Sequence, residues 1–408
     1  MNFVAECYVK LVLWMGVYDP DYVDAYFGPP EWRPATGDLK IEPFPYAEFD
    51  GRANNCVEEL VRIACPQFDE PEKRRHAMLM KQFAAVKAKI FLLSGRNLMF
   101  DQESELLYDA VAPTYTEDHF KNLLIELDAL LPGRGEVSQR LEKFRQPFII
   151  PKSKLDLVFT AAINEGRRRT LQHISLPSNE RFSVEYVNNK PWSGYNWYKG
   201  DSYSLIQVNT DLPIFIERAV DLACHEGYPG HHVFNLLIEK NLVRERKWME
   251  YTIYPLYSPQ SLIAEGSANY GIEVALPGAE RVQFEKDVLF PLAGIDPTRA
   301  EEYYKIYDVT QKLSYAGNEA ARKYLDGKIK KNEAVEWLIT YGLFAPERAE
   351  QRLRFIETYR SYVINYNLGL DMVRTYIEKH GGSEGDPARR WQLFEELLSE
   401  PHTPSGLK

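Results

Sequence analysis

The sequence predicts a mainly α-helical protein that carries one small β-sheet near the middle of the chain. Over most of the 408 residues, apolar side chains recur at intervals of three and four, with charged side chains on the opposite face. Residues 182–210 depart from this pattern and contain short aromatic and β-branched runs instead. Hydrophobic residues make up 45% of the chain and charged residues 26%, which is ordinary for a folded globular protein.

The N-terminal part of the chain is predicted to be helical. The helices expected from apolar recurrence span residues 1–18, 52–65, 70–93, 116–131 and 151–173. Pro113 and Pro151 are among the residues that interrupt these runs. At this length two lobes or one large helical domain are both plausible. We expect an N-terminal helical region over residues 1–150 and a second region over residues 151–408, or one integrated domain made of both.

Residues 182–210 predict a small antiparallel sheet or a set of hairpins. Asn, Gly and Pro separate its aromatic and β-branched runs, as turns between strands require. The runs span residues 182–187, 192–198 and 203–208. Asp211 then fits the N-cap of the following helix, with Pro213 inside its first turn. An extended peptide can add to the edge of such a sheet as a further strand.

The helical pattern returns after residue 259 and continues almost to the end of the chain. The helices expected there span residues 259–276, 297–326, 331–341, 346–379 and 387–399. The predicted fold class is therefore mainly α, with a small sheet directly before the helix that reaches His225.

Charge and composition argue against several classes of protein. The formal net charge of −10 argues against nucleic acid as a partner, because binding a polyanion depends on clustered Lys and Arg. No stretch approaches eighteen uninterrupted apolar residues, so we expect no transmembrane span and no membrane partner. The four cysteines show no paired spacing and fit free thiols in a reducing compartment. We therefore expect a cytoplasmic protein.

The most informative segment is HEGYPGHH at residues 225–232. Three of the eight histidines of the chain fall within it, beside Glu226 and after an apolar helical run. A second acidic segment, AEGSANY at residues 264–270, follows further along the chain. Two imidazoles, a carboxylate from a later helix and a spare Glu beside the first His form the donor set of a catalytic zinc site. We interpret these segments as the site of a metal-dependent hydrolase.

The histidine spacing requires a distorted helix. In the common zinc motif the two histidines lie four residues apart on one face of a helix. Here His231 follows His225 by six positions, or ~9 Å on an unbroken helix, and His232 follows by seven, or ~10.5 Å. Both spans are too long for two ligands that each lie ~2.0 Å from one ion. Pro229 and Gly230 supply a reason for the chain to bend between the ligands.

The candidate residues can be given distinct roles. His225 is the first ligand, and His231 is favoured over His232 as the second because its spacing departs less from the usual four. Glu265 is the candidate third ligand, in a segment whose neighbours are small and apolar. Glu226 would act as a general base beside one bound Zn²⁺ ion. One turn after Glu265, Asn269 lies on the same helix face and can hydrogen-bond the outer nitrogen of a ligand histidine.

These segments resemble a known family. HEGYPGHH resembles the His-Glu-x-x-Pro-Gly-His-His signature of the bacterial family catalogued as domain of unknown function 885. Its members are regarded as zinc metallopeptidases, largely helical and similar in site logic to the gluzincins. AEGSANYGIE at 264–273 resembles the family's Ala-Glu-Gly-Trp-Ala-x-Tyr-x-x-Glu segment, with Ser267 where Trp is usual. Further similar stretches lie at residues 22–29, 206–210 and 365–369.

The resemblance implies a large helical metallopeptidase-like fold and a set of site residues. It implies that His225, one of His231 and His232, and Glu265 are metal ligands, and that Glu226 is the base. Tyr366 becomes a candidate for polarising the substrate carbonyl or stabilising an oxyanion. The chain departs from the family by having RSYV at 360–363 in place of a Pro-Gly-Gln-Ala run before that tyrosine.

The function predicted from the sequence is that of a zinc-dependent metallopeptidase. It would cleave short peptides with metal-activated water and a Glu general base, and its partner would be a peptide or another small amide. One alternative is a metal-dependent amide or ester hydrolase of non-peptide substrates that uses the same atoms. Another is a non-catalytic helical binding protein with a structural metal, in which a fourth protein ligand would close the coordination shell.

Overall fold

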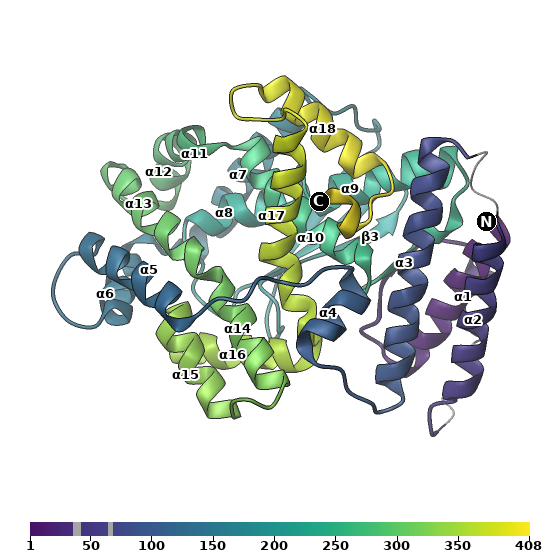
Figure 1. Cartoon of the computed structure of the whole chain (residues 1–408). Helices are drawn as coiled ribbons and strands as arrows, with labels where there is room; N and C mark the ends of the chain where they lie inside the picture. The colour runs from purple at the N-terminus through teal and green to yellow at the C-terminus, as the bar shows by residue number, and fades with distance from the viewer. Residues whose placement is uncertain (36–41, 64–67) are drawn as a thin grey trace.

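The computed structural model describes residues 1–35, 42–63 and 68–408, and it confirms a mainly helical architecture around a small sheet (Figure 1). Its α-helices are α1 (Asn2–Tyr18), α2 (Tyr46–Arg62), α3 (Glu70–Leu93), α4 (Phe100–Tyr108), α5 (Glu117–Leu130), α6 (Val137–Arg145), α7 (Leu155–Thr170), α8 (Glu217–Leu222), α9 (His231–Leu237), α10 (Pro259–Ala275), α11 (Gly278–Phe284), α12 (Phe290–Ala293), α13 (Ala300–Gln311), α14 (Ala316–Leu325), α15 (Lys331–Gly342), α16 (Pro346–Tyr359), α17 (Ile364–Lys379) and α18 (Pro387–Ser399).

Most helix predictions are confirmed to within a few residues, and the exceptions have local causes. Helix α2 begins earlier than the predicted 52–65, and the last two residues of that prediction lie outside the described residues. The predicted helix 346–379 is divided between α16 and α17, because Arg360 adopts a positive φ of 52° that ends the first helix. The short helices α4, α6 and α11 were not predicted, since each offers only two or three turns of pattern.

The small sheet lies where the sequence places it, directly before the helix that carries His225. Its strands are β2 (Arg181–Val187), β3 (Gly194–Gly200) and β4 (Tyr203–Asn209), in the spatial order β2-β4-β3. Strands β3 and β4 form the predicted antiparallel hairpin, while β2 runs parallel to β4 on its other side. A separate antiparallel pair joins β1 (Val23–Tyr26) to β5 (Ile253–Pro255), so the start of the chain lies beside its middle.

The predicted helix start at Asp211 and Pro213 is wrong. Helix α8 begins only at Glu217. Backbone hydrogen bonds of 2.9 Å tie residues 214–216 to residues 148–150, and an antiparallel bridge connects the two segments. These pairings hold the chain extended where the local sequence favours a first helical turn, so tertiary contacts override the capping signal.

Helices α10 and α17 pack against each other backbone to backbone at two glycines. An added Cβ on Gly266 would lie 2.4 Å from the backbone of Gly369, and one on Gly369 would lie 2.7 Å from the carbonyl oxygen of Leu262. Real Cβ atoms do not approach backbone this closely, so only glycine permits the contact. The two helices cross in the centre of the molecule (Figure 1), and their approach sets the distance between Glu265 and the start of α17.

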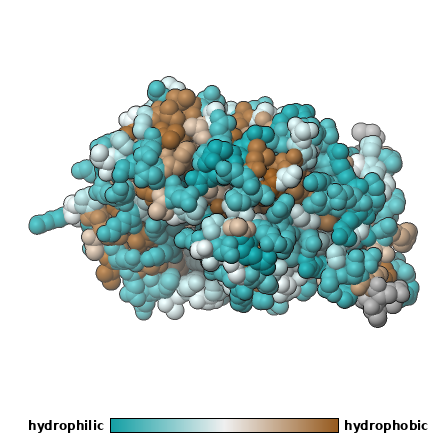
Figure 2. Space-filling view, turned by 90° about the horizontal axis from the view of Figure 1, so that it is seen from above, coloured by the Kyte–Doolittle hydropathy of each residue, from teal (hydrophilic) through white to brown (hydrophobic). Residues whose placement is uncertain are grey.

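Buried apolar side chains from α1 to the last residues of the chain form one continuous core. Within the described residues, no helix has both the length and the apolar content that crossing a bilayer needs. Figure 2 shows a face that is mostly hydrophilic, with apolar atoms gathered in separate patches.

Substitution of Gly266 by Ala should lower the free energy of unfolding by about 1–3 kcal/mol, because the added methyl group must push two helix backbones apart. Urea denaturation followed by circular dichroism measures the change. Gly51→Ala in α2 is the matched control, since a Cβ there meets no atom within 4 Å. The control should be stabilised by roughly 0.5–1 kcal/mol. Equal effects of the two substitutions would contradict the proposed close approach.

Candidate metal centre

The helix that carries His225 is broken between the two histidines, as the spacing requires. Helix α8 continues into a π-helical turn, Ala223–Gly227, which contains His225 and Glu226. The chain then becomes extended at Tyr228, and α9 begins at His231. The backbone N–H of Gly230 donates to the carbonyl oxygen of Cys224 at 2.9 Å, which closes the turn.

Gly230 is the residue that makes this turn sterically possible. A Cβ at this position would lie 1.9 Å from the carbonyl oxygen of His225 and 2.4 Å from that of Cys224. Both neighbours are backbone atoms and cannot move aside as a flexible side chain can. The glycine in the motif is therefore a geometric requirement of the turn.

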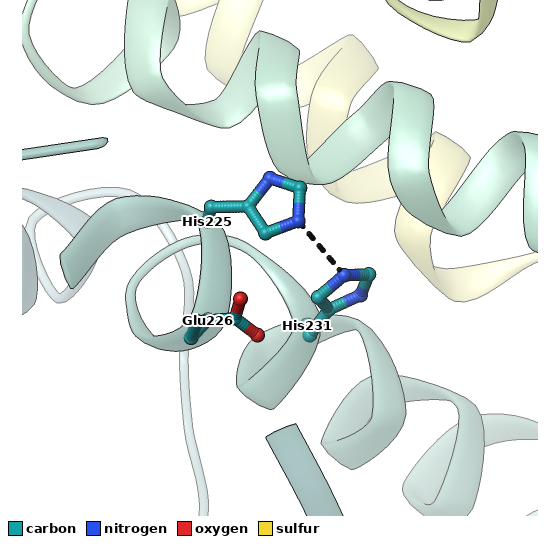
Figure 3. A group of neighbouring side chains, drawn as sticks. All are labelled: His225, Glu226 and His231. Carbon is teal, nitrogen blue, oxygen red and sulfur yellow. Dashed lines mark hydrogen bonds between the residues drawn. The ribbon is translucent and has the colours of Figure 1, made fainter. Parts of the chain in front are cut away.

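The break brings the two imidazole rings together. The Nε2 atoms of His225 and His231 lie 3.1 Å apart, with the ring planes nearly perpendicular at 88° (Figure 3). On a continuous helix the same residues would be separated by ~9 Å along the axis. The predicted distortion is thus confirmed, and it places two nitrogen donors side by side.

Glu265 reaches this pair of rings from α10. Its Oε2 atom lies 3.2 Å from Nε2 of His225 and 3.7 Å from Nε2 of His231. Its other oxygen, Oε1, accepts a hydrogen bond of 2.7 Å from the hydroxyl of Tyr362. Burial by itself raises the pKa of Glu265, but the two neighbouring histidines outweigh it and lower this pKa well below its usual range.

The three donor atoms have the separations that one zinc ion requires. Ligands at ~2.0 Å in a tetrahedral arrangement lie about 3.3 Å from one another. The observed separations of 3.1, 3.2 and 3.7 Å bracket this value. Oε2 of Glu265 is also buried without a hydrogen-bond partner, which is the state of an acceptor whose ligand is a cation. The residues therefore fit the metal that the motif implies.

Glu226 offers a second carboxylate with a different electrostatic setting. It lies beside the two rings, with candidate ligand atoms of His225, Glu226 and His231 all within 4.8 Å of one another (Figure 3). Its side chain is 4% exposed. Burial, together with the nearby negative charge of Glu265, raises the pKa of Glu226 to about 7, against a lowering effect of His231. The structure thus contains one carboxylate suited to stay ionised and one suited to exchange a proton near neutrality.

The orientation of the His225 ring is fixed from outside. Nδ1 of His225 lies 2.9 Å from Oδ1 of Asn269, while the amide Nδ2 of Asn269 donates to the carbonyl oxygen of Tyr366 at 2.8 Å. Because the amide nitrogen is already committed, its oxygen faces the ring, so Nδ1 carries the proton. In the neutral ring with this tautomer, Nε2 keeps the lone pair that a metal ligand needs.

His232 faces the opposite way and takes part in a buried network. Its Nδ1 lies 2.8 Å from Oγ of Ser204, and its Nε2 lies 3.3 Å from Oε2 of Glu180. The same Oε2 accepts a 2.5 Å hydrogen bond from the hydroxyl of Tyr228. His232 is fully buried, and both its ring nitrogens are occupied. The structure therefore places His231, and not His232, against His225. His232 instead anchors the start of α9 through its contacts with Ser204 and Glu180.

Tyr366 lies beside the His225 ring. The two rings are stacked, with centroids 6.5 Å apart. Tyr366 also lines a large groove whose walls include His225, His231 and Glu265. Burial, with the negative charge of Glu265, raises the pKa of Tyr366 well above its usual value. The hydroxyl therefore stays protonated and can donate a hydrogen bond.

Two further residues of the site were not anticipated from the sequence. Tyr362, which binds Glu265, lies one helical turn before Tyr366, and that spacing was an available signal. Asp24 on β1 lines the same groove and accepts a hydrogen bond from the hydroxyl of Tyr195. Burial and the nearby Glu265 and Glu226 raise the pKa of Asp24 to about 8. Its place within the similar stretch 22–29 was the only hint.

Two solved structures share the fold of this chain. A protein from Colwellia psychrerythraea described as a candidate lipoprotein aligns with a TM-score of 0.55 at 13% identity, over 88% of this chain. This chain spans 65% of the length of that protein. M32 carboxypeptidase from Deinococcus radiodurans R1 aligns with a TM-score of 0.51 at 13% identity, over 100% of this chain and 92% of its own. The chain therefore shares the large, mainly helical fold of these two proteins.

No protein-family model matches the chain, and no curated protein matches it. The resemblance to domain of unknown function 885 therefore stays a prediction carried by the motifs.

Substitution of Gly230 by Ala should separate the two rings, because the added methyl group cannot coexist with the carbonyl oxygen of His225. We expect zinc affinity, measured by competition with a chromophoric chelator, to fall at least about tenfold, as supporting residues of metal sites typically show. Gly51→Ala serves as the control and should bind zinc as the parent does. Unchanged zinc affinity in a folded Gly230→Ala protein would contradict the role given to this turn.

Proposed function

We propose that the chain is a zinc-dependent hydrolase, and specifically a metallopeptidase that cleaves short peptides. His225, His231 and Glu265 would hold one Zn²⁺ ion, and Glu226 and Tyr366 would act on the substrate. The observation that carries the proposal is the separation of the three donor atoms, 3.1 to 3.7 Å, with a second carboxylate of raised pKa directly beside them. In a structural zinc site Glu226 would instead close the coordination shell as a fourth ligand.

Zinc, when bound, would supply Lewis-acid activation of a water molecule and of the substrate carbonyl. Asn269 would keep the His225 lone pair directed at the ion, through the 2.9 Å hydrogen bond to Nδ1. Tyr362 would hold Glu265 in place by donating to its Oε1. These contacts position donor atoms in advance, which limits the cost of reorganisation on binding.

Glu226 would move the proton. Its carboxylate accepts a proton from the attacking water and then donates it to the leaving amine. A pKa of about 7 suits both steps, because the group can be protonated and deprotonated near neutral pH. Gly194 of β3 leaves room for this side chain, since a Cβ there would lie 2.8 Å from Oε1 of Glu226.

Tyr366 would stabilise the carbonyl oxygen as it gains negative charge. Its high pKa keeps the hydroxyl protonated, and its ring is stacked beside His225. A preorganised donor of this kind is worth more in a partly dehydrated site than in water.

A peptide substrate is favoured by the groove and by the sheet beside it. The groove has a volume of about 1690 Å³ and includes Gly194, Tyr195 and Asn196 of strand β3. Among the described strands, β3 pairs with β4 alone, although β1 packs near it, so the other edge of β3 carries no strand pairing and could accept an extended chain. The fold shared with an enzyme named as a carboxypeptidase also favours a peptide substrate. The cytoplasmic location and the absence of nucleic-acid and membrane partners stay predictions.

Zinc content distinguishes the two adjacent histidines. Purified protein should bind about one zinc per chain, and His231→Ala should lose this zinc because one of three ligands is removed. His232→Ala should keep it, but should be destabilised by about 1–3 kcal/mol because Glu180 and Ser204 lose a buried partner. Elemental analysis and thermal unfolding measure the two effects. Loss of zinc from His232→Ala alone would reverse the assignment.

Turnover tests the general base. Glu226→Gln should retain zinc while its rate falls by about 100- to 10,000-fold, because the amide cannot accept the proton. The assay is mass spectrometry of a pool of short peptides, run beside panels of acyl amides and esters. Glu185→Gln, on an exposed position of β2, is the control and should hydrolyse as the parent does. Hydrolysis retained by Glu226→Gln would exclude this role, and activity confined to the ester or acyl-amide panels would exclude a peptidase.

A further inference from the structure

Helix α16 forms part of the groove wall and directs two arginines into it. Arg348 and Arg352 lie one turn apart on this helix, and both line the groove that contains His225 and Glu226. Both are partly buried. Neither was singled out by the sequence motifs, because α16 lies more than a hundred residues after HEGYPGHH.

Other arginines along the groove are neutralised by carboxylates of the chain. Arg145 pairs with Glu217 at 2.7 Å, and Arg281 pairs with Asp221 at 2.8 Å. Such pairing is the normal condition of a buried or partly buried arginine. These residues are therefore explained by the fold.

Arg348 and Arg352 lack this compensation. Within residues 1–35, 42–63 and 68–408, neither forms an ion pair, and Arg348 has only a 3.1 Å hydrogen bond to the amide oxygen of Gln351. Burial lowers the pKa of Arg352, and burial together with neighbouring arginines, Arg218 first, lowers that of Arg348 to about 10. Among the described residues, these two partly buried cationic groups thus line the groove without a direct ion pair, and an incoming anion would offset the cost of their burial.

Arg352 is close to the metal-site residues. Its guanidinium lies 4.9 Å from the centre of the Phe355 ring, whose centroid is 6.2 Å from that of Tyr366. The Tyr366 ring is in turn 6.5 Å from that of His225. Successive side-chain contacts through Phe355 and Tyr366 thus connect the Arg352 guanidinium to the His225 ring.

We propose that Arg352, assisted by Arg348, binds a carboxylate group of the substrate and so selects peptides that carry one near the cleaved bond. The inference rests on the proposed peptidase function and names the substrate class of the same site. Arginine binds carboxylates through two parallel hydrogen bonds, which fixes orientation as well as affinity. The free C-terminus of a short peptide and an acidic side chain both offer this group.

Carboxylates suit this groove better than phosphates. Glu265, and Glu226 when it is ionised, line the same groove, so a dianion would meet stronger repulsion than a single carboxylate does. Arg352 reaches the His225 ring only through successive contacts of Phe355 and Tyr366, so a carboxylate bound to it is not held against the imidazole. The arrangement separates the anchoring charge from the reacting bond.

Equilibrium binding tests the inference without requiring turnover. The probes are acetyl-trialanine with a free carboxylate, its C-terminal amide, and the amide with glutamate in the central position. Zinc-loaded protein carrying Glu226→Gln would be titrated by calorimetry, so that the peptides stay intact. We expect the free acid to bind about 10- to 100-fold more tightly than the amide, as a charge-assisted hydrogen-bonded pair allows. Tight binding of the amide that contains glutamate would show that Arg352 recognises a side-chain carboxylate. Weak binding of that amide, beside tight binding of the free acid, would show that it recognises the C-terminal carboxylate.

Substitutions on α16 assign the effect to particular side chains. In Arg352→Gln the preference for a carboxylate should disappear, in Arg348→Gln it should be reduced, and Arg352→Lys should restore part of it. Arg354→Gln, at an exposed position of the same helix, is the matched control and should keep the full preference. Circular dichroism and zinc content establish that each variant is folded.

Two results would overturn the inference. One is equal or equally undetectable binding of acids and amides by the parent, and the other is a preference that survives loss of Arg352. A protein that hydrolyses acids and amides alike would keep the proposed peptidase function and lose this inference. If the protein prefers a carboxylate but hydrolyses no peptide, the inference about Arg352 would stand and the proposed peptidase function would be lost.

Discussion

The candidate site depends on one steric constraint, the contact of Gly230 with the backbone of the turn that precedes it. A π-helical turn and an extended residue replace the regular helix between His225 and His231, and only a residue without Cβ fits beneath the carbonyl oxygen of His225. The backbone of the turn is held by the hydrogen bond from Gly230 to Cys224. His232 fixes the start of α9 through buried polar contacts with Ser204 and Glu180. The imidazole pair is thus a product of backbone geometry.

A second close approach delivers the carboxylate and the tyrosines. Because Gly266 and Gly369 let α10 and α17 touch, Glu265 lies within hydrogen-bonding distance of Tyr362, and Asn269 reaches both His225 and the backbone of Tyr366. Two helices that are about a hundred residues apart in sequence act as one support. Through this packing, one contact between two helices positions the candidate ligand Glu265, the amide of Asn269 and the candidate proton donor Tyr366 together.

Electrostatics then distinguishes groups of the same chemical type. Glu265 and Glu226 are both buried, yet neighbouring histidines lower the pKa of the first, while burial and the charge of Glu265 raise that of the second to about 7. The arginines divide in the same way: Arg145 pairs with Glu217, whereas Arg352 forms no ion pair with any residue that the structure describes. In each pair the environment, and not the residue type, decides whether the group is ionised or paired.

The sequence by itself determined the helical class, the position of the sheet and the residues of the motif, because helix periodicity and the HEGYPGHH pattern are local properties of the chain. It also required a break between His225 and His231 if both bind one ion, because an unbroken helix would hold their side chains ~9 Å apart along its axis. The tertiary structure alone decided that His232 turns inward, that β2 pairs parallel with β4 and that Arg352 has no ion-pair partner in the described part of the chain. Each of these depends on which distant segments become neighbours, and residue order does not encode that directly.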